Sequence, residues 1–270
     1  MIIDFHTHVF PDRIAERTVA ALSRKGGIPA HSDGTVGGLI SSMDRCGCDI
    51  AVNLPVLTSP TQFDSITAFA SGINGSEVGK RIISFAGIHP DSEDVEQRIA
   101  EIRAAGFLGI KLHPDYQRTF FDDARYIRIL RAARDAGLIT VTHAGYDVGF
   151  PNEEIKCTPK RVLRALDAIG GYPRLVLAHL GGNELFGEVI ASLAGTDVYF
   201  DTSYVLKVAT RAEFFAILEK HGEDRILFAS DSPWRDVGSE IEHIRSYGLT
   251  ATAEEKILAK NAMKLLGLDR

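Results

Sequence analysis

The residues with the clearest chemical potential lie at the start of the chain, in the stretch MIIDFHTHVF. Asp4, His6 and His8 alternate there, and alternate side chains of a β-strand share one face. Neutral imidazoles and a carboxylate are ligands that suit Zn2+, with Mn2+, Fe2+ or Co2+ as alternatives. The alternation therefore predicts a metal centre where this first strand ends.

Similar polar residues follow the other hydrophobic runs of the chain. Eight β-rich runs can be recognised, at residues 2–6, 49–54, 81–88, 108–112, 138–143, 174–179, 198–203 and 225–230. The polar residues at or just after their ends are His6, His8, Asn53, His89, Lys111, His113, His143, His179, Asp201, Ser203, Ser230 and Asp231. Six of the nine histidines belong to this set, whereas chance would place about one there if such positions make up roughly a tenth of the chain. The clustering indicates a functional site at the strand ends.

Amphipathic stretches of helical period separate these runs, at residues 92–106, 122–137 and 158–171, and each of them ends at glycine. A further helical stretch, at 252–268, follows the last run. This alternation predicts βα units around a parallel sheet. Eight such units in roughly 250 residues match the size of a (β/α)8 TIM barrel, although an open doubly wound sheet has the same alternation. In a barrel, the active site is built at the C-terminal ends of the strands, where these polar residues lie.

The composition favours small-molecule chemistry. With 270 residues, 45% of them apolar, the chain can bury a sizeable core, and no composition break divides it, so we expect one domain over residues 1–270. The net charge of -6 and the lack of a dense Lys/Arg run argue against a nucleic-acid partner or an anionic membrane surface. No secretory signal is evident, and the apolar runs are too short to span a bilayer. Three cysteines, an odd number, suit a cytoplasmic protein, and a homo-oligomer is possible.

A catalytic metal centre needs an open coordination position and a proton acceptor. Three or four protein ligands plus water is the expected pattern, and the bound water loses its proton near neutral pH and can then attack a carbonyl. Asp231 ends the stretch RILFASD, so it can contact the metal through one oxygen and accept the proton through the other.

Five motifs in this order, DFHTH, GIKLHP, VTHAG, LAHLGG and FASDSPW, together resemble the amidohydrolase superfamily. The resemblance covers nearly the whole chain and is strongest to the amidohydrolase-related branch of aminocarboxymuconate-type decarboxylases and lactone hydrolases. It implies a single-domain, distorted TIM barrel and a metal held by His6, His8, His143 and Asp231. His179 would then orient or polarise the substrate or the attacking water, or else bind a second metal.

Lys111 leaves the number of metal ions open. In binuclear members of the superfamily, a lysine on strand four is carboxylated and bridges two metals. We expect one ion, most simply Zn2+, and a Lys111 ammonium that faces a substrate carboxylate. We also place Asn53, His113, Trp234 and Arg235 at the substrate, because they lie at or beside strand ends, and Arg235 suits a carboxylate or phosphate.

Two further groups surround these residues in the sequence. The segment 144–159 is long for a βα connection and contains Tyr146, Asp147 and Phe150, so we expect it to cover the substrate. Asp201 and Ser203 can fix imidazole orientation. The three remaining histidines stand in polar or helical context and are predicted at the surface: His31, His221 and His243.

Three functions are compatible with this site. The leading expectation is a metal-dependent hydrolase of an amide, lactone or related ester bond in a small anionic molecule. The alternative is a metal-dependent, non-oxidative decarboxylase of a small carboxylic acid. A non-catalytic barrel that only binds metal or metabolite is disfavoured, because a buried, charged Asp231 without a partner would cost stability.

Overall fold

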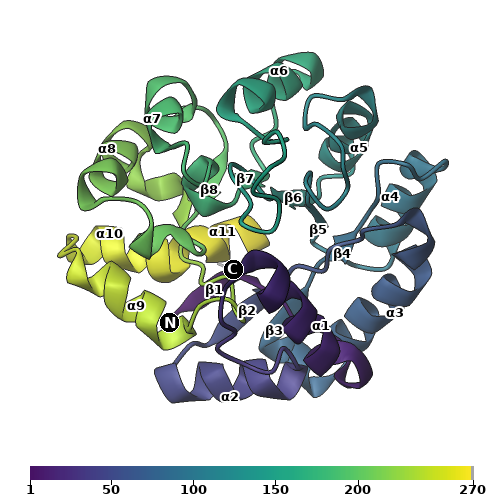
Figure 1. Ribbon diagram of the computed structural model, residues 1–270, viewed down its shortest axis with the longest axis horizontal. Helices are drawn as coiled ribbons and strands as arrows, with labels where there is room; N and C mark the ends of the chain where they lie inside the picture. The colour runs from purple at the N-terminus through teal and green to yellow at the C-terminus, as the bar shows by residue number, and fades with distance from the viewer. Residues whose placement is uncertain (269–270) are drawn as a thin grey trace.

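The computed structural model describes residues 1–268, in which parallel strands are surrounded by helices (Figure 1). One sheet has the order β1-β2-β3 and the other the order β4-β5-β6-β7-β8-β9, with every neighbouring pair parallel. The strands are β1 (Ile3–Thr7), β2 (Ile50–Asn53), β3 (Ile82–Ser84), β4 (Ala86–Gly87), β5 (Gly109–Leu112), β6 (Ile139–Thr142), β7 (Leu175–Leu177), β8 (Tyr199–Asp201) and β9 (Ile226–Leu227). The parallel α/β architecture expected from the sequence is therefore confirmed.

The helices occupy the intervals between the strands. Their bounds are α1 (Asp12–Gly26), α2 (Val36–Cys46), α3 (Phe63–Asn74), α4 (Val95–Ala104), α5 (Ala124–Asp135), α6 (Pro159–Ile169), α7 (Phe186–Glu188), α8 (Arg211–His221), α9 (Val237–Ser246), α10 (Ala251–Glu255) and α11 (Asn261–Leu266). The predicted stretches 92–106, 122–137 and 158–171 contain α4, α5 and α6. The closing stretch contains α10, the π-helical turn η7 (Lys256–Lys260) and α11. Along residues 1–268, no helix combines the length and the apolar character that a membrane crossing requires.

Each predicted run contains a strand, but the third run divides into β3 and β4 at Phe85. The backbone N–H of Phe85 donates to the Asn53 carbonyl at 2.9 Å, and its ring is fully buried. That ring packs edge-on against Phe5, 6.1 Å away between centroids, and a side chain at Gly109 would collide with it. The chain thus passes from one sheet to the other through a residue that fills the apolar interior.

Backbone hydrogen bonds join β1 to the segment that follows β9. Phe5 N–H donates to Phe228 O at 2.9 Å, and Asp231 N–H donates to His6 O at 2.9 Å. Thr7 and Ser232 also form a parallel bridge. The first and last strand segments of the fold are therefore neighbours, which brings the histidines of β1 beside Asp231.

His221 is the one surface prediction that the structure overturns. Its side chain is buried near the end of α8, with the ring stacked on Phe200 at a centroid separation of 3.8 Å. Its Nε2 hydrogen bonds to the Val198 carbonyl at 3.1 Å, and burial lowers the pKa of the imidazole to about 4. His221 is thus a neutral packing residue, which its polar sequence neighbours do not reveal.

Candidate functional site

The C-terminal ends of the strands open into a cavity of about 450 Å³. The predicted site residues that line it are His6, His8, Lys111, His113, His143, His179, Asp231 and Trp234. They come from segments far apart in the sequence and meet because the strands are parallel, so that their C-terminal ends lie on one side of the fold. The structure therefore brings these eight side chains together around one cavity.

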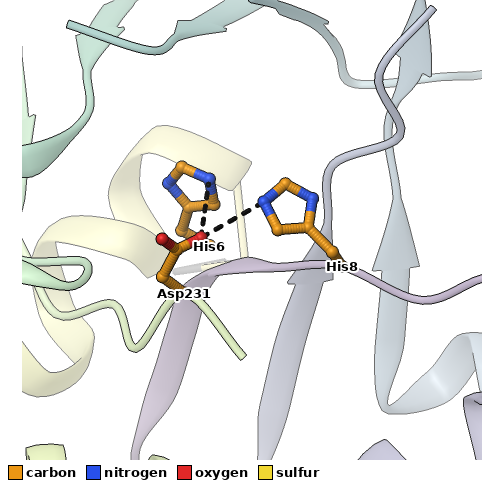
Figure 2. A group of neighbouring side chains, drawn as sticks. All are labelled: His6, His8 and Asp231. Carbon is orange, nitrogen blue, oxygen red and sulfur yellow. Dashed lines mark ion pairs between the residues drawn. The ribbon is translucent and has the colours of Figure 1, made fainter. Parts of the chain in front are cut away.

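His6, His8 and Asp231 form a compact group within the cavity (Figure 2). His8 Nε2 lies 3.2 Å from Asp231 Oδ1, and His6 Nε2 lies 3.6 Å from the same oxygen. One ligand atom from each residue lies within 4.8 Å of the others, a spacing that one cation can bridge. Asp231 has a left-handed backbone, with φ of 71°, which is uncommon outside glycine and tends to occur at functional sites.

The other ring nitrogen of each of these two histidines is held by a fixed partner. His6 Nδ1 lies 2.9 Å from Asp201 Oδ2, and His8 Nδ1 lies 2.9 Å from the Leu54 carbonyl. A carbonyl or a carboxylate can only accept, so each Nδ1 carries the proton in these bonds. Each Nε2 is left with a lone pair that faces Asp231. Asp201 thus has the orienting position expected for it.

Burial sets the charge of this group. Loss of hydration lowers the pKa of His6 to about 4, and the nearby Lys111 acts in the same direction, so the imidazole is neutral at neutral pH. Burial alone would raise the pKa of Asp231, but the surrounding His8, His6 and His179 lower it below its usual value, so the carboxylate is ionised. Two imidazole nitrogen donors and one anionic oxygen donor fit a divalent cation of the zinc type.

Asp4, which alternates with His6 and His8 in the sequence, does not join this group. The pairing of β1 with β2 shifts register between Asp4 and Thr7, and such an irregularity redirects side chains. Asp4 accepts instead from Ser230, at 2.5 Å from Oγ and 2.9 Å from the backbone N–H. Its carboxyl group therefore forms hydrogen bonds between β1 and the segment that follows β9.

His143 lies beside His179 rather than within the first group. His143 Nδ1 and His179 Nε2 are 2.9 Å apart, and His179 Nδ1 is 2.8 Å from the Ser203 carbonyl. By ligand-atom spacing, His143 belongs to a second group with His113 and Asp147. Its role as a fourth ligand of the first cation stays a prediction.

Lys111 is fully enclosed at the cavity floor. Its Nζ lies 2.9 Å from His6 Nε2, and burial lowers the pKa of this amine to about 8. The amine therefore reaches the same lone pair of His6 that a metal would use. This position places Lys111 at the cation site as well as in the cavity, and its contact with a substrate carboxylate stays a prediction.

Asn53 and Arg235 do not line the cavity. Asn53 Oδ1 accepts from Val9 N–H at 3.0 Å and its Nδ2 donates to Ser84 Oγ at 2.8 Å, so its amide links neighbouring segments. Arg235 Nε donates to the Tyr204 carbonyl at 3.3 Å, and the guanidinium carbon lies 4.2 Å from the centre of the Tyr204 ring. Both side chains are directed by partners that are distant in the sequence.

Helix α1 supplies a wall of the cavity that the sequence reasoning missed. Arg13, Ile14, Thr18 and Leu22 all line the cavity, and the last three repeat every fourth residue, which puts them on one helix face. In Figure 1, α1 lies inward of the outer helices. The spacing of Ile14, Thr18 and Leu22 in the sequence was the signal that could have predicted this helix face. From the predicted covering segment 144–159, Tyr146 and Asp147 reach the cavity.

Comparison with known proteins places this site in a family context. A family model described as Amidohydrolase matches residues 3–268. No curated protein matches the chain. The fold resembles that of 2,6-dihydroxybenzoate decarboxylase from Rhizobium, with 15% identity, a TM-score of 0.74 and coverage of 100% of this chain and 99% of that one.

Two further solved structures show the same fold. A putative 2-pyrone-4,6-dicarboxylic acid hydrolase from Pseudomonas putida has 18% identity and a TM-score of 0.68, with 100% and 98% coverage of the two chains. A dihydroxybenzoic acid decarboxylase from Polaromonas sp. JS666, with bound manganese and 2-nitroresorcinol, has 15% identity and a TM-score of 0.70, with 100% and 97% coverage. Because the match to the family model spans nearly the whole sequence, this chain belongs to the amidohydrolase family.

Proposed function

We propose that the protein is a metal-dependent hydrolase that opens an amide, lactone or related ester bond in a small anionic molecule. The observation that carries this proposal is the convergence of the His6 and His8 Nε2 atoms on an ionised Asp231 in a cavity. These three residues would hold the cation, with His143 as the expected fourth ligand. When bound, a divalent cation lowers the pKa of its water enough to make hydroxide at neutral pH.

The cation is proposed to be Zn2+, because neutral imidazoles and a carboxylate are common zinc ligands. Mn2+ is the main alternative, since the Polaromonas decarboxylase of the same fold holds manganese. The donor set contains no cysteine sulfur, so it does not distinguish these two borderline ions.

Asp231, His179 and the cationic residues of the cavity have separate roles in this reaction. Asp231 accepts the water proton at its second carboxylate oxygen, since Oδ1 faces the two histidines. His179 is fixed by the Ser203 carbonyl at one nitrogen and lies against His143 at the other, so its ring presents a constant edge to the cavity. Arg13 and Lys111 line the cavity with cationic groups and support an anionic substrate.

Decarboxylation is the second candidate, because solved structures of the same fold include decarboxylases of dihydroxybenzoates. The same three residues would hold the cation, and Lys111 beside His6 would bind the substrate carboxylate. The two reactions then differ in the product: hydrolysis opens a bond to a carbonyl, whereas decarboxylation releases carbon dioxide and delivers a proton to carbon.

The test is to incubate the metal-loaded protein with panels of lactones, cyclic amides and aromatic acids, and to follow ring opening and carbon dioxide release separately. Ring opening is expected, and Asp231→Asn should lower kcat by at least roughly 10²-fold because it removes a positioned base. The exposed Asp135→Asn, at the end of α5, is the matched control and should retain activity. Carbon dioxide release without ring opening would establish the second candidate, and binding without turnover in any metal form would exclude both.

A further inference from the structure

We propose that the substrate carries an unbranched alkyl chain, which binds along an apolar wall of the cavity built by α1, the segment after β2 and α3. The inference rests on the proposed function for the reacting end of the molecule, and it adds the class of group attached to that end. Five apolar side chains that line the cavity form this apolar wall: Ile14 and Leu22 of α1, Val56 of the segment after β2, and Ile66 and Phe69 of α3. The same cavity contains Asp231 with its two histidines, so one molecule can contact both regions.

The rest of the chain does not cover these apolar side chains. On α1, Val19 is buried against the protein, whereas Ile14 and Leu22 of the same helix stay partly exposed. Ile66 and Phe69 of α3 are also only partly buried. Apolar surface that faces water inside a concave site favours an apolar ligand that covers it.

The apolar wall is long. Ile14, Thr18 and Leu22 recur every fourth residue, so they face the cavity from one side of α1. From Ile14 to Leu22 the helix advances about 12 Å, at about 1.5 Å per residue. The donor atoms grouped around Asp231 lie within 4.8 Å of one another, so they match only part of this length. An extended chain advances roughly 1.2 Å per bond, so this stretch of helix matches about ten bonds of an alkyl chain.

The polar groups of this wall are engaged within their own segments. Gln62 Oε1 accepts from the backbone N–H groups of Thr58 and Ser59 at 2.8 and 3.2 Å, and Ser65 Oγ donates to the Gln62 carbonyl at 3.1 Å. Among the described residues that α1, α3 and the connection from β2 to α3 contribute to the cavity, Arg13 is the only charged one. A ligand with many polar groups would find few partners here, whereas an alkyl chain has no hydrogen bonds to lose.

The strand ends and the apolar wall together favour an amphipathic substrate. Lys111 and Asp231 lie at the strand ends, where the polar, anionic and reacting end of the molecule would bind. The alkyl chain would continue from there along Ile14 and Leu22. A single aromatic ring would leave much of this wall uncovered, so the length of the wall favours a chain.

Trp234 provides a measurement of binding that does not depend on turnover. It is the single tryptophan of the sequence and lines the cavity, so its fluorescence reports a ligand there. Straight-chain carboxylates from butanoate to dodecanoate are titrated into the metal-loaded protein, with benzoate for comparison. We expect the dissociation constant to fall roughly 2- to 4-fold for each added methylene and to stop falling at about ten carbons. Benzoate should bind more weakly than octanoate.

Two substitutions test the wall itself. Ile14→Asn and Leu22→Asn each place an amide among the apolar side chains, and each should weaken decanoate binding by at least roughly 10-fold, while butanoate binding changes much less. The matched control is Ala21→Asn, which introduces the same residue at an exposed position of α1 and should bind every carboxylate as the wild-type protein does. Thermal unfolding of each variant shows whether a loss of binding is a loss of fold.

A dissociation constant independent of chain length would overturn the proposal, as would decanoate binding that folded Ile14→Asn and Leu22→Asn both retain. Tighter binding of benzoate than of octanoate would overturn it in favour of an aromatic ring. Each of these results is compatible with ring opening in the lactone panel and would leave the proposed hydrolase intact. The expected chain-length dependence without any ring opening would reject the hydrolase and support the alkyl-chain site.

Discussion

His6 and His8, which form a compact group with Asp231, each have different partners at their two ring nitrogens. His6 binds Asp201 through Nδ1, and His8 binds the Leu54 carbonyl through Nδ1, so both rings turn Nε2 toward Asp231. A partner on one nitrogen fixes both the proton position and the ring orientation. Asp201 thereby fixes the orientation of His6 in the proposed metal site.

We predict that Asp201→Asn weakens metal binding by roughly 10- to 100-fold. Asp201 Oδ1 accepts from the backbone N–H groups of His179 and Ser203, both at 3.0 Å, and the Asn carbonyl oxygen can keep these two bonds. The amide nitrogen would then face His6 Nδ1–H, where donor meets donor, and the ring would lose its orienting acceptor. The dissociation constant for Zn2+, measured by competition with a chelator, checks this.

The matched control is Asp197→Asn, which lies before β8 and pairs at the surface with Arg225. It should leave the dissociation constant unchanged. Equal zinc affinity for Asp201→Asn and the wild-type protein would show that His6 does not need this partner.

At the residue scale, the sequence predicted correctly those side chains whose place in the cavity follows from the direction of the strands alone. His6, Lys111, His143 and Asp231 are such cases, since parallel strands end on one side. Arg235 could not be predicted, because the ring and carbonyl of Tyr204 direct it. The pairing of His113 with Asp147 likewise depends on contacts between two segments in space.

At the scale of a single element, helix α9 contains an acid within its apolar stripe. Its buried residues Val237, Glu240, Ile241 and Ile244 follow the spacing of one helix face. Glu240 is fully enclosed, and both of its carboxylate oxygens are without a hydrogen-bond partner within residues 1–268. Burial raises the pKa of Glu240 from 4.5 to about 7, although Arg235 and Lys207 partly oppose this effect.

We predict that Glu240→Gln stabilises the protein above pH 7. The folded state binds this proton more tightly than the unfolded state, so the wild-type protein loses stability as pH rises from 4.5 to about 7. The shift corresponds to an upper limit of about 3 kcal/mol at pH 8, and the difference should vanish near pH 4. Urea unfolding of both proteins at several pH values measures it.

Glu242→Gln provides the control on the same helix, because Glu242 is exposed and pairs with Arg245. Its free energy of unfolding should stay within about 0.5 kcal/mol of the wild-type value at every pH. A pH-independent difference for Glu240→Gln would mean that Glu240 does not ionise in this range.

The sequence predicted the bounds of an element where the apolar spacing is regular, and it missed them where tertiary packing sets the end of a strand. The stretch 122–137 predicted α5 within two residues at each end, because its apolar spacing and its final glycine agree. The break at Phe85 could not be predicted, since its run reads as one continuous strand. The break reflects an interior that accepts this ring beside Phe5 and Gly109.

At the scale of the whole molecule, the contact between Asp4 and Ser230 joins the first strand to the segment that follows the last strand. The residues are 226 positions apart, and Asp4 accepts from both the hydroxyl and the backbone N–H of Ser230. Burial raises the pKa of Asp4 to about 7, while these hydrogen bonds act against the rise. The same β1 segment carries His6 and His8, so this contact supports the alignment of these two histidines with Asp231.

We therefore predict that Ser230→Ala lowers the free energy of unfolding by about 1–3 kcal/mol, because it leaves a buried carboxylate oxygen without its donor. The loss should be larger at pH 8 than at pH 6, since the pKa of Asp4 is about 7 and the ionised form depends more on a donor. Urea unfolding at the two pH values measures both effects. Ser192→Ala removes an exposed hydroxyl that donates to the Glu188 carbonyl, and should change the free energy by less than about 0.5 kcal/mol. Equal stability of Ser230→Ala and Ser192→Ala at pH 8 would show that other bonds between the first and last strand segments hold them together without this hydroxyl.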